Sequence, residues 1–85
     1  MKEKLDIIKK EIMEPMNKMD IIVDSIDFVN ENNYYFLKIV LDKVNGIDLD
    51  TIVEATNVIN PIIDNLDLIE EEYILDVYAK SKGDE

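Results

Sequence analysis

Residues 41–56 read LDKVNGIDLDTIVEAT, and they set one glycine, Gly46, among several acidic side chains. A stretch of this composition suits two different structures. It is either a cation-binding loop, in which carboxylates hold a metal ion, or an elbow that turns a β-strand into a helix. The choice decides the fold, because the elbow places a strand before the glycine and a helix after it.

The spacing of the acidic residues argues against a calcium loop. An EF-hand loop needs oxygen ligands at its first, third and fifth positions, a glycine at the sixth and a glutamate at the twelfth. Counted from Asp42, the third position is Val44 and the twelfth is Val53. Counted from Leu41, Gly46 falls sixth but the first ligand is lost. We therefore expect an elbow here and no metal site.

The elbow gives each polar residue a separate role. Asn45–Gly46 allows the turn, and Asp48 is a good N-cap for a helix that begins at Leu49. Pro61 lies inside the helical pattern that follows, so it either kinks this helix or starts a new short turn. The residues that carry the helical spacing are Leu49, Ile52, Val53, Thr56, Ile59 and Ile63.

A first helix is predicted from about residue 2, where apolar residues again recur at helical spacing. Pro15 predicts that this helix stops near Glu14–Asn17, because the residue before a proline disfavours the helical conformation. The residues that carry the spacing are Leu5, Ile8, Ile12 and Met16.

Three strands complete the pattern. Residues 20–31, DIIVDSIDFVNE, alternate from Val23 onward, and the polar cluster Asn30–Asn33 separates them from YYFLKIVLDK. So short a connection predicts an antiparallel hairpin. EEYILDVYA, residues 71–79, alternates as the third strand.

The sequence thus predicts one α+β domain with the order α-β-β-α-β. Two helices should pack on one face of a three-stranded sheet. The apolar face for them consists of Ile26, Phe28, Leu37, Ile39, Leu41, Leu75 and Val77. The opposite face should meet water, yet it carries four large apolar residues, which makes it a candidate partner surface. These four are Phe36, Val40, Ile74 and Tyr78.

The charge of the chain is unevenly placed. The 85 residues carry a formal net charge of −11, but residues 1–18 hold five Lys against four acids. Residues 19–79 hold two Lys against fourteen acids. This segment would repel a phosphate backbone, so direct nucleic-acid binding is not expected of this chain alone, and a basic partner suits it better. The alternative is that the charge only maintains solubility.

Several functional classes find no support in the composition. There is no His and no Cys, so the commonest general base and the thiol nucleophile are missing, and we expect neither an enzyme nor a cofactor. No apolar run approaches the ~20 residues of a membrane span, and residues 1–16 are charged throughout, unlike a signal peptide. We expect a soluble cytoplasmic protein with no membrane partner.

Three co-linear segments resemble one family, the ribosome maturation factor RimP. They are EPMNKMDIIVDSIDFV (residues 14–29), YYFLKIVLDKVNGIDLDTIVEAT (34–56) and IIDNLDLIEEEYILDVYA (62–79). The resemblance implies the N-terminal α/β domain of a non-catalytic, two-domain factor that assists assembly of the small ribosomal subunit. The partners it implies are the immature subunit and a basic ribosomal protein of the decoding region.

The end of the chain departs from the family. The family continues from the third strand through Ser-Pro-Gly and an Arg into a small SH3-like barrel, whereas Ala79, Lys80, Ser81 and Lys82 stand there in this sequence. We expect residues 1–79 to form the domain and residues 80–85 a flexible tail, without the barrel, in an excised domain or a shortened relative. The alternative function is a generic acidic interaction or self-association domain, including a weak homodimer.

Overall fold

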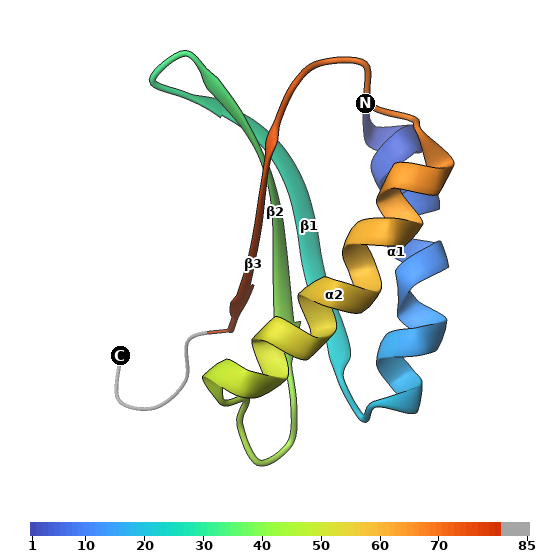
Figure 1. The fold of residues 1–85 in the computed structure, drawn as a ribbon, viewed down its shortest axis with the longest axis vertical. Helices are drawn as coiled ribbons and strands as arrows, with labels where there is room; N and C mark the ends of the chain where they lie inside the picture. Colours follow the sequence, from blue (N-terminus) through green and yellow to red (C-terminus); the bar gives the residue numbers. More distant parts are fainter. Residues whose placement is uncertain (81–85) are drawn as a thin grey trace.

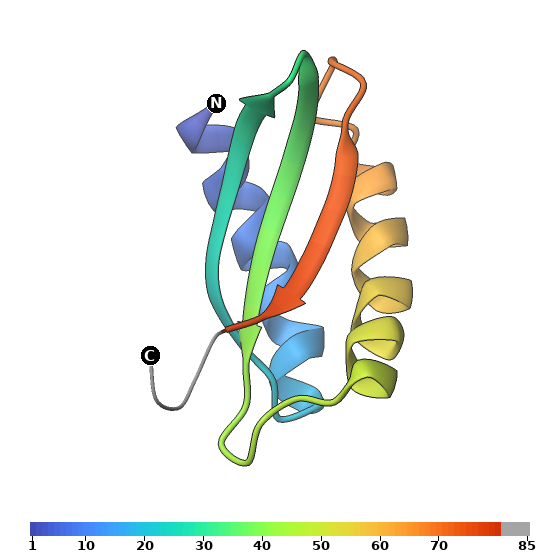
Figure 2. The same ribbon diagram turned by 90° about the vertical axis from the view of Figure 1, so that its left-hand side faces the viewer.

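The computed structural model of the chain describes residues 1–80, and it has the predicted order of elements. Two helices lie side by side on one face of a three-stranded sheet (Figure 1), and the other face of the sheet is uncovered (Figure 2). The α+β fold is therefore confirmed. The elements are α1 (Lys2–Lys18), β1 (Ile22–Glu31), β2 (Tyr34–Asp42), α2 (Leu49–Leu66) and β3 (Ile74–Ala79).

The predicted hairpin closes through a turn of only two residues. Asn32 and Asn33 have φ values of 54° and 70°, as a type I′ turn requires. Asparagine tolerates this left-handed region better than most residues. Asn30 and Glu31, which the sequence assigned to the turn, are instead the last residues of β1.

β2 lies in the middle of the sheet, antiparallel to β1 and parallel to β3. A β-bulge interrupts β1 between Val23 and Ser25. The extra residue, Asp24, lets both Val23 and Ile26 face the helices although they are three positions apart, because a bulge shifts the side-chain alternation by one residue. The alternation predicted from Val23 onward therefore contains this one irregularity.

The core lies between the sheet and the two helices. The predicted apolar face is confirmed, since each of its seven residues belongs to the core or packs against it. β2 contributes the fully buried centre of this face, and α1 and α2 contribute three buried side chains each. The buried residues are Ile8, Ile12, Met16, Ile21, Val23, Leu37, Ile39, Leu41, Ala55, Ile59, Ile63 and Ile69.

Both prolines lie inside helices. α1 continues to Lys18, one residue past the predicted end near Glu14–Asn17. Met16, the residue after Pro15, is fully buried and anchors the last helical turn in the core. α2 is one continuous helix through Pro61, so the alternative of a separate new turn is wrong. Ile59 and Ile63 flank Pro61 and are buried, which favours continued helix despite the missing N–H.

The elbow has the predicted structure. Gly46 adopts a φ of 86° and its N–H donates to the Lys43 carbonyl (2.9 Å), which closes the turn. The Asp48 carboxylate accepts a hydrogen bond from the Thr51 N–H (2.9 Å), as expected of an N-cap. Hydrogen bonds from Thr51 lower the pKa of Asp48. The acidic residue thus caps a helix.

The described chain ends just after β3. Lys80, which the sequence assigned to the tail, donates its N–H to the Leu41 carbonyl (2.7 Å), and its ammonium group lies 3.3 Å from an Asp24 carboxylate oxygen. The rest of the predicted tail lies outside the described residues. No helix within residues 1–80 is long and apolar enough to cross a membrane.

Candidate partner surface

The four residues of the predicted partner surface lie on the face of the sheet that the helices leave uncovered. We call this the open face; it consists of every second residue of the strands, and Figure 2 views it from the front. Phe36 lies beside Ile74, and Val40 lies beside Tyr78, on the neighbouring strands β2 and β3. The four therefore form two apolar pairs.

A row of charged residues separates the two pairs. Lys38 on β2 lies between Asp27 on β1 and Asp76 on β3. The Lys38 ammonium group contacts a Glu31 carboxylate oxygen at 2.9 Å and lies 5.9 Å from the centre of the Phe36 ring. The hydrogen bond to Glu31 is the main cause that raises the pKa of Lys38. The open face is thus an apolar surface crossed by an acidic row that holds one lysine.

Exposure differs between the strands. Ile74 and Tyr78, on the edge strand β3, are 48% and 42% exposed, whereas Phe36 and Val40 on the central strand are half-buried. Ile22 also belongs to this face, beside Asp42, and is 51% exposed. It escaped the sequence reasoning because the bulge at the next residues reverses the alternation, and a bulge leaves little signal in a single sequence.

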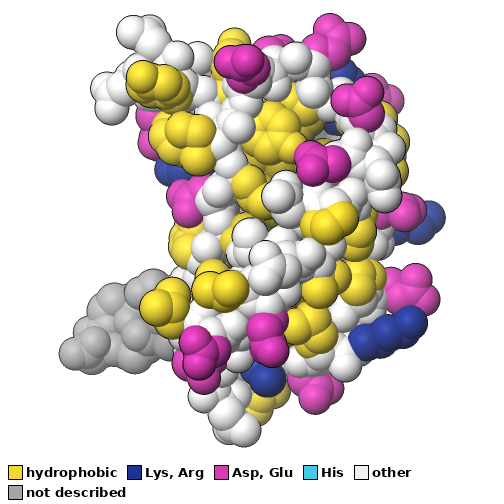
Figure 3. Space-filling view, viewed as in Figure 1, with side chains coloured by type: hydrophobic (Ala, Val, Ile, Leu, Met, Phe, Trp, Pro, Cys, Tyr) yellow, Lys and Arg dark blue, Asp and Glu magenta, His cyan; other side chains and the backbone are white. Residues whose placement is uncertain are grey.

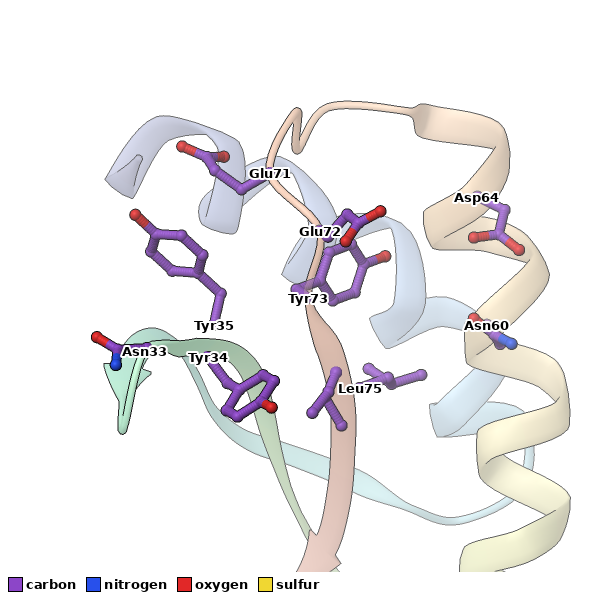
Figure 4. Close-up of a pocket in the computed structure, with 10 residues that line it drawn as sticks. Asn33, Tyr34, Tyr35, Asn60, Asp64, Glu71, Glu72, Tyr73 and Leu75 are labelled. Atoms are coloured by element: carbon purple, nitrogen blue, oxygen red, sulfur yellow. The ribbon is translucent and has the colours of Figure 1, made fainter.

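A second feature lies at the hairpin end of the sheet, and we call it the hairpin-end hollow. It opens between the hairpin, the start of β3 and the last two turns of α2, and it has a volume of about 1150 Å³ (Figure 4). The sequence reasoning did not find it. Its lining residues are Asn33, Tyr34, Tyr35, Asn60, Asp64, Glu71, Glu72, Tyr73, Ile74 and Leu75.

The hollow exists because β3 joins the sheet late. The pairing of β2 with β3 begins at Phe36 and Ile74, although β2 itself begins at Tyr34. Tyr34 and Tyr35 thus have a strand neighbour on the β1 side only. The chain between α2 and β3 arches away at this point and leaves the space open.

Packing fixes the aromatic wall of the hollow. Phe28 stacks on Tyr35 with a ring-centre distance of 5.0 Å, and it meets Tyr73 edge-to-face at 6.3 Å. Both arrangements are the favourable ones for aromatic pairs. Desolvation, followed by the negative charge of Asp64, raises the pKa of Tyr73. Figure 4 shows the Tyr73 ring between Tyr35 on the hairpin and Asp64 on α2.

The comparison with protein families agrees with the geometry. The model of the RimP N-terminal domain family matches residues 11–80. This match covers most of the 85-residue chain. The chain belongs to the RimP N-terminal domain family. The family is that of a ribosome maturation factor, and it is not a known family of enzymes.

Family membership confirms the resemblance carried by the hairpin, the elbow and the third strand. Within residues 1–80, no group of three or more acidic, histidine or cysteine side chains is placed to hold a metal ion.

Proposed function

We propose that this chain is a non-catalytic binding domain that assists maturation of the small ribosomal subunit by holding a basic ribosomal protein. The family match over residues 11–80 is the observation that carries this proposal. The partner would be a basic protein of the decoding region on the immature subunit, and the work would take place in the cytoplasm.

The placement of charge supports a basic partner. Residues 19–79 contain fourteen acidic residues and two lysines, and one of these lysines, Lys38, already pairs with Glu31. Opposite charges on two proteins raise the rate of encounter and favour the correct orientation. The same charge disfavours direct contact of this domain with ribosomal RNA.

The open face supports a docking role for the sheet. It combines exposed apolar side chains on β3 with carboxylates on all three strands, so a partner could make apolar contacts on both sides of the charged row. Tyr78 and Ile74 would supply apolar contact, while Asp27 and Asp76 would steer a lysine- or arginine-rich surface into place.

Binding to purified small-subunit ribosomal proteins at low and at high salt tests the proposal. We expect capture of a basic protein that weakens as salt rises, since exposed charges are screened beyond about 10 Å at 0.1 M salt. A variant with Asp27→Asn and Asp76→Asn should bind more slowly. The matched control, Glu11→Gln with Glu54→Gln, changes the net charge equally on the helices. Equal loss in both variants would show that only total charge matters.

Self-association is the contrasting possibility, with Phe36, Val40, Ile74 and Tyr78 forming a contact between two copies. Sedimentation at several protein concentrations separates it from the proposed function. A sedimentation coefficient that does not change with concentration would disfavour the homodimer and leave the open face available for a different protein.

A further inference from the structure

We propose that the hairpin-end hollow receives a lysine or arginine side chain from an extended segment of a protein partner. The inference rests on the proposed function for the basic character of that partner, and on the geometry of the hollow for the site itself. It places recognition at a second position, next to the open face.

The hollow combines aromatic side chains with negative charge. Three tyrosines, Tyr34, Tyr35 and Tyr73, line the hollow together with three carboxylates, and no lysine is among the described residues that line it. The faces of aromatic rings attract cations, and the attraction grows where water is partly excluded. Figure 3 shows hydrophobic side chains in the upper part of the view with acidic side chains around them.

Among residues 1–80, the ion pairs of Lys38 and Lys80 do not involve the carboxylates of the hollow. Lys38 pairs with Glu31 and Lys80 pairs with Asp24, so neither lysine is paired with Asp64, Glu71 or Glu72. The last turn of α2 contains no basic residue, although the helix dipole places its negative end there. A cation from outside would therefore meet an uncompensated negative potential.

Two of the tyrosine rings that line the hollow are held in place by contacts within the domain. Phe28 holds Tyr35 and Tyr73 by two ring contacts, so these rings need little reorganisation to accept a ligand. Sites that are ordered before binding lose less conformational entropy on binding. Tyr34 is the most exposed tyrosine of the site, at 62%.

The shape of the site favours a polypeptide over a small free amine. The hollow is wide and open rather than enclosed, so a lone amine would keep most of its water. Its lining includes Ile74, which also belongs to the open face, so the two surfaces are continuous. Beside it, Tyr34 and Tyr35 have no strand neighbour on the β3 side, which leaves room for an extended segment.

Titration of the 85-residue chain with short peptides tests the inference. The probe is an acetylated, amidated peptide of alternating Gly and Lys, with an Arg version and a norleucine version of equal length. Backbone NMR shifts should change for residues that line the hollow on addition of the Lys and Arg peptides. We expect the norleucine peptide to leave these shifts unchanged, because it keeps the apolar stem and lacks the charge.

Two variants separate the hollow from the overall charge of the domain. The double variant Glu71→Gln with Glu72→Gln keeps the shape of the site. It should lower the affinity for the Lys peptide by roughly fivefold or more. The matched control, Glu11→Gln with Glu54→Gln, changes the net charge by the same amount elsewhere and should bind nearly as the unaltered chain does. Tyr34→Ala, at the most exposed tyrosine of the site, should weaken binding without unfolding the domain.

Three results would overturn the inference. They are equal binding of the norleucine peptide, equal weakening by the two double variants, and shift changes that map away from the hollow. Failure here is distinguishable from failure of the proposed function. The chain could capture a basic ribosomal protein and yet show no shift changes at the hollow on addition of the peptides. This result would support the proposed function and show that the hollow is not part of the binding site.

Discussion

The two faces of the central strand have opposite surroundings, one buried under the helices and the other accessible to solvent. β2 directs Leu37, Ile39 and Leu41 toward the helices, where all three are 0% exposed. The alternate residues Lys38 and Val40 face the other way and remain partly accessible. Successive side chains of a strand point to opposite sides, so neighbouring residues in the sequence have different physical surroundings.

Substitution of neighbouring residues on β2 should give the largest difference in stability between the two faces of the strand. Ile39→Ala removes a fully buried side chain and should cost about 2–5 kcal/mol of unfolding free energy. That is a large part of the ~5–15 kcal/mol by which a domain is stable. Urea unfolding followed by circular dichroism measures the loss.

The matched control for this experiment is Val40→Ala, one residue further along the strand. Val40 is half-buried and has no helix above it, so we expect a loss below about 1.5 kcal/mol. Equal losses at the two positions would mean that the open face is covered in solution, for example by a second copy of the chain.

The helical cover of the buried face contains a weak point at Pro61. Its ring is exposed, and it interrupts the hydrogen bonding of α2 between the buried residues Ile59 and Ile63. Pro61→Ala should therefore raise the free energy of unfolding by about 1–2 kcal/mol, less than the full helix penalty because proline also restricts the unfolded chain. Urea unfolding again gives the measurement.

The control for Pro61 is Asn57→Ala, an exposed position one turn earlier in α2. This change improves helix propensity only, so a gain of a few tenths of a kcal/mol is expected. A gain at Pro61 no greater than that at Asn57 would show that α2 accommodates its proline without strain.

How far the sequence predicts this molecule depends on whether a feature is local. The elbow was predictable in detail, because Gly46 and Asp48 act on their immediate neighbours. The burial of Ile39 was predictable because strand alternation is regular around it. The bulge at Asp24 was not, since it depends on the register between two strands, and Ile22 was missed with it.

The open face and the hairpin-end hollow were predictable only in part for the same reason. Alternation correctly placed Tyr78 and Ile74 on the open face. It could not show that Lys38 pairs with Glu31, which lies seven residues away. The hollow arises where β3 joins β2 late, and its walls come from three separate segments, so no spacing within one segment indicates it.

The N-cap of α2 should contribute less to stability than the buried side chains of β2, and its contribution should depend on pH. Because Thr51 lowers the pKa of Asp48 in the folded state, the stabilisation by this carboxylate is present above its unfolded pKa of about 3.9 and is lost as pH falls through the lower folded value. Asp48→Ala should lower the urea midpoint at pH 7 by a fraction of the Ile39→Ala effect. The difference from the unaltered chain should shrink below pH 4.

Asp48→Asn is the control, because asparagine also accepts the hydrogen bond from Thr51 and caps a helix well. It should be close to the unaltered chain in stability at pH 7, and its difference from Asp48→Ala should persist in acid. A loss at Asp48→Ala that is independent of pH would assign the effect to the hydrogen-bond acceptor, which the protonated carboxyl keeps, and not to the negative charge.

The smallest effect on stability is expected where the largest effect on binding lies. Tyr78 is 42% exposed on the open face, and Ile7 is 46% exposed on α1, so the two expose comparable apolar side chains on opposite sides of the molecule. Tyr78→Ser and Ile7→Ser should each change the free energy of unfolding by less than about 1 kcal/mol. Only Tyr78→Ser should weaken capture of a basic ribosomal protein, because only Tyr78 lies on the proposed docking surface. Equal capture by both variants would place the partner elsewhere, whereas weaker capture by Ile7→Ser alone would move the docking surface to the helices.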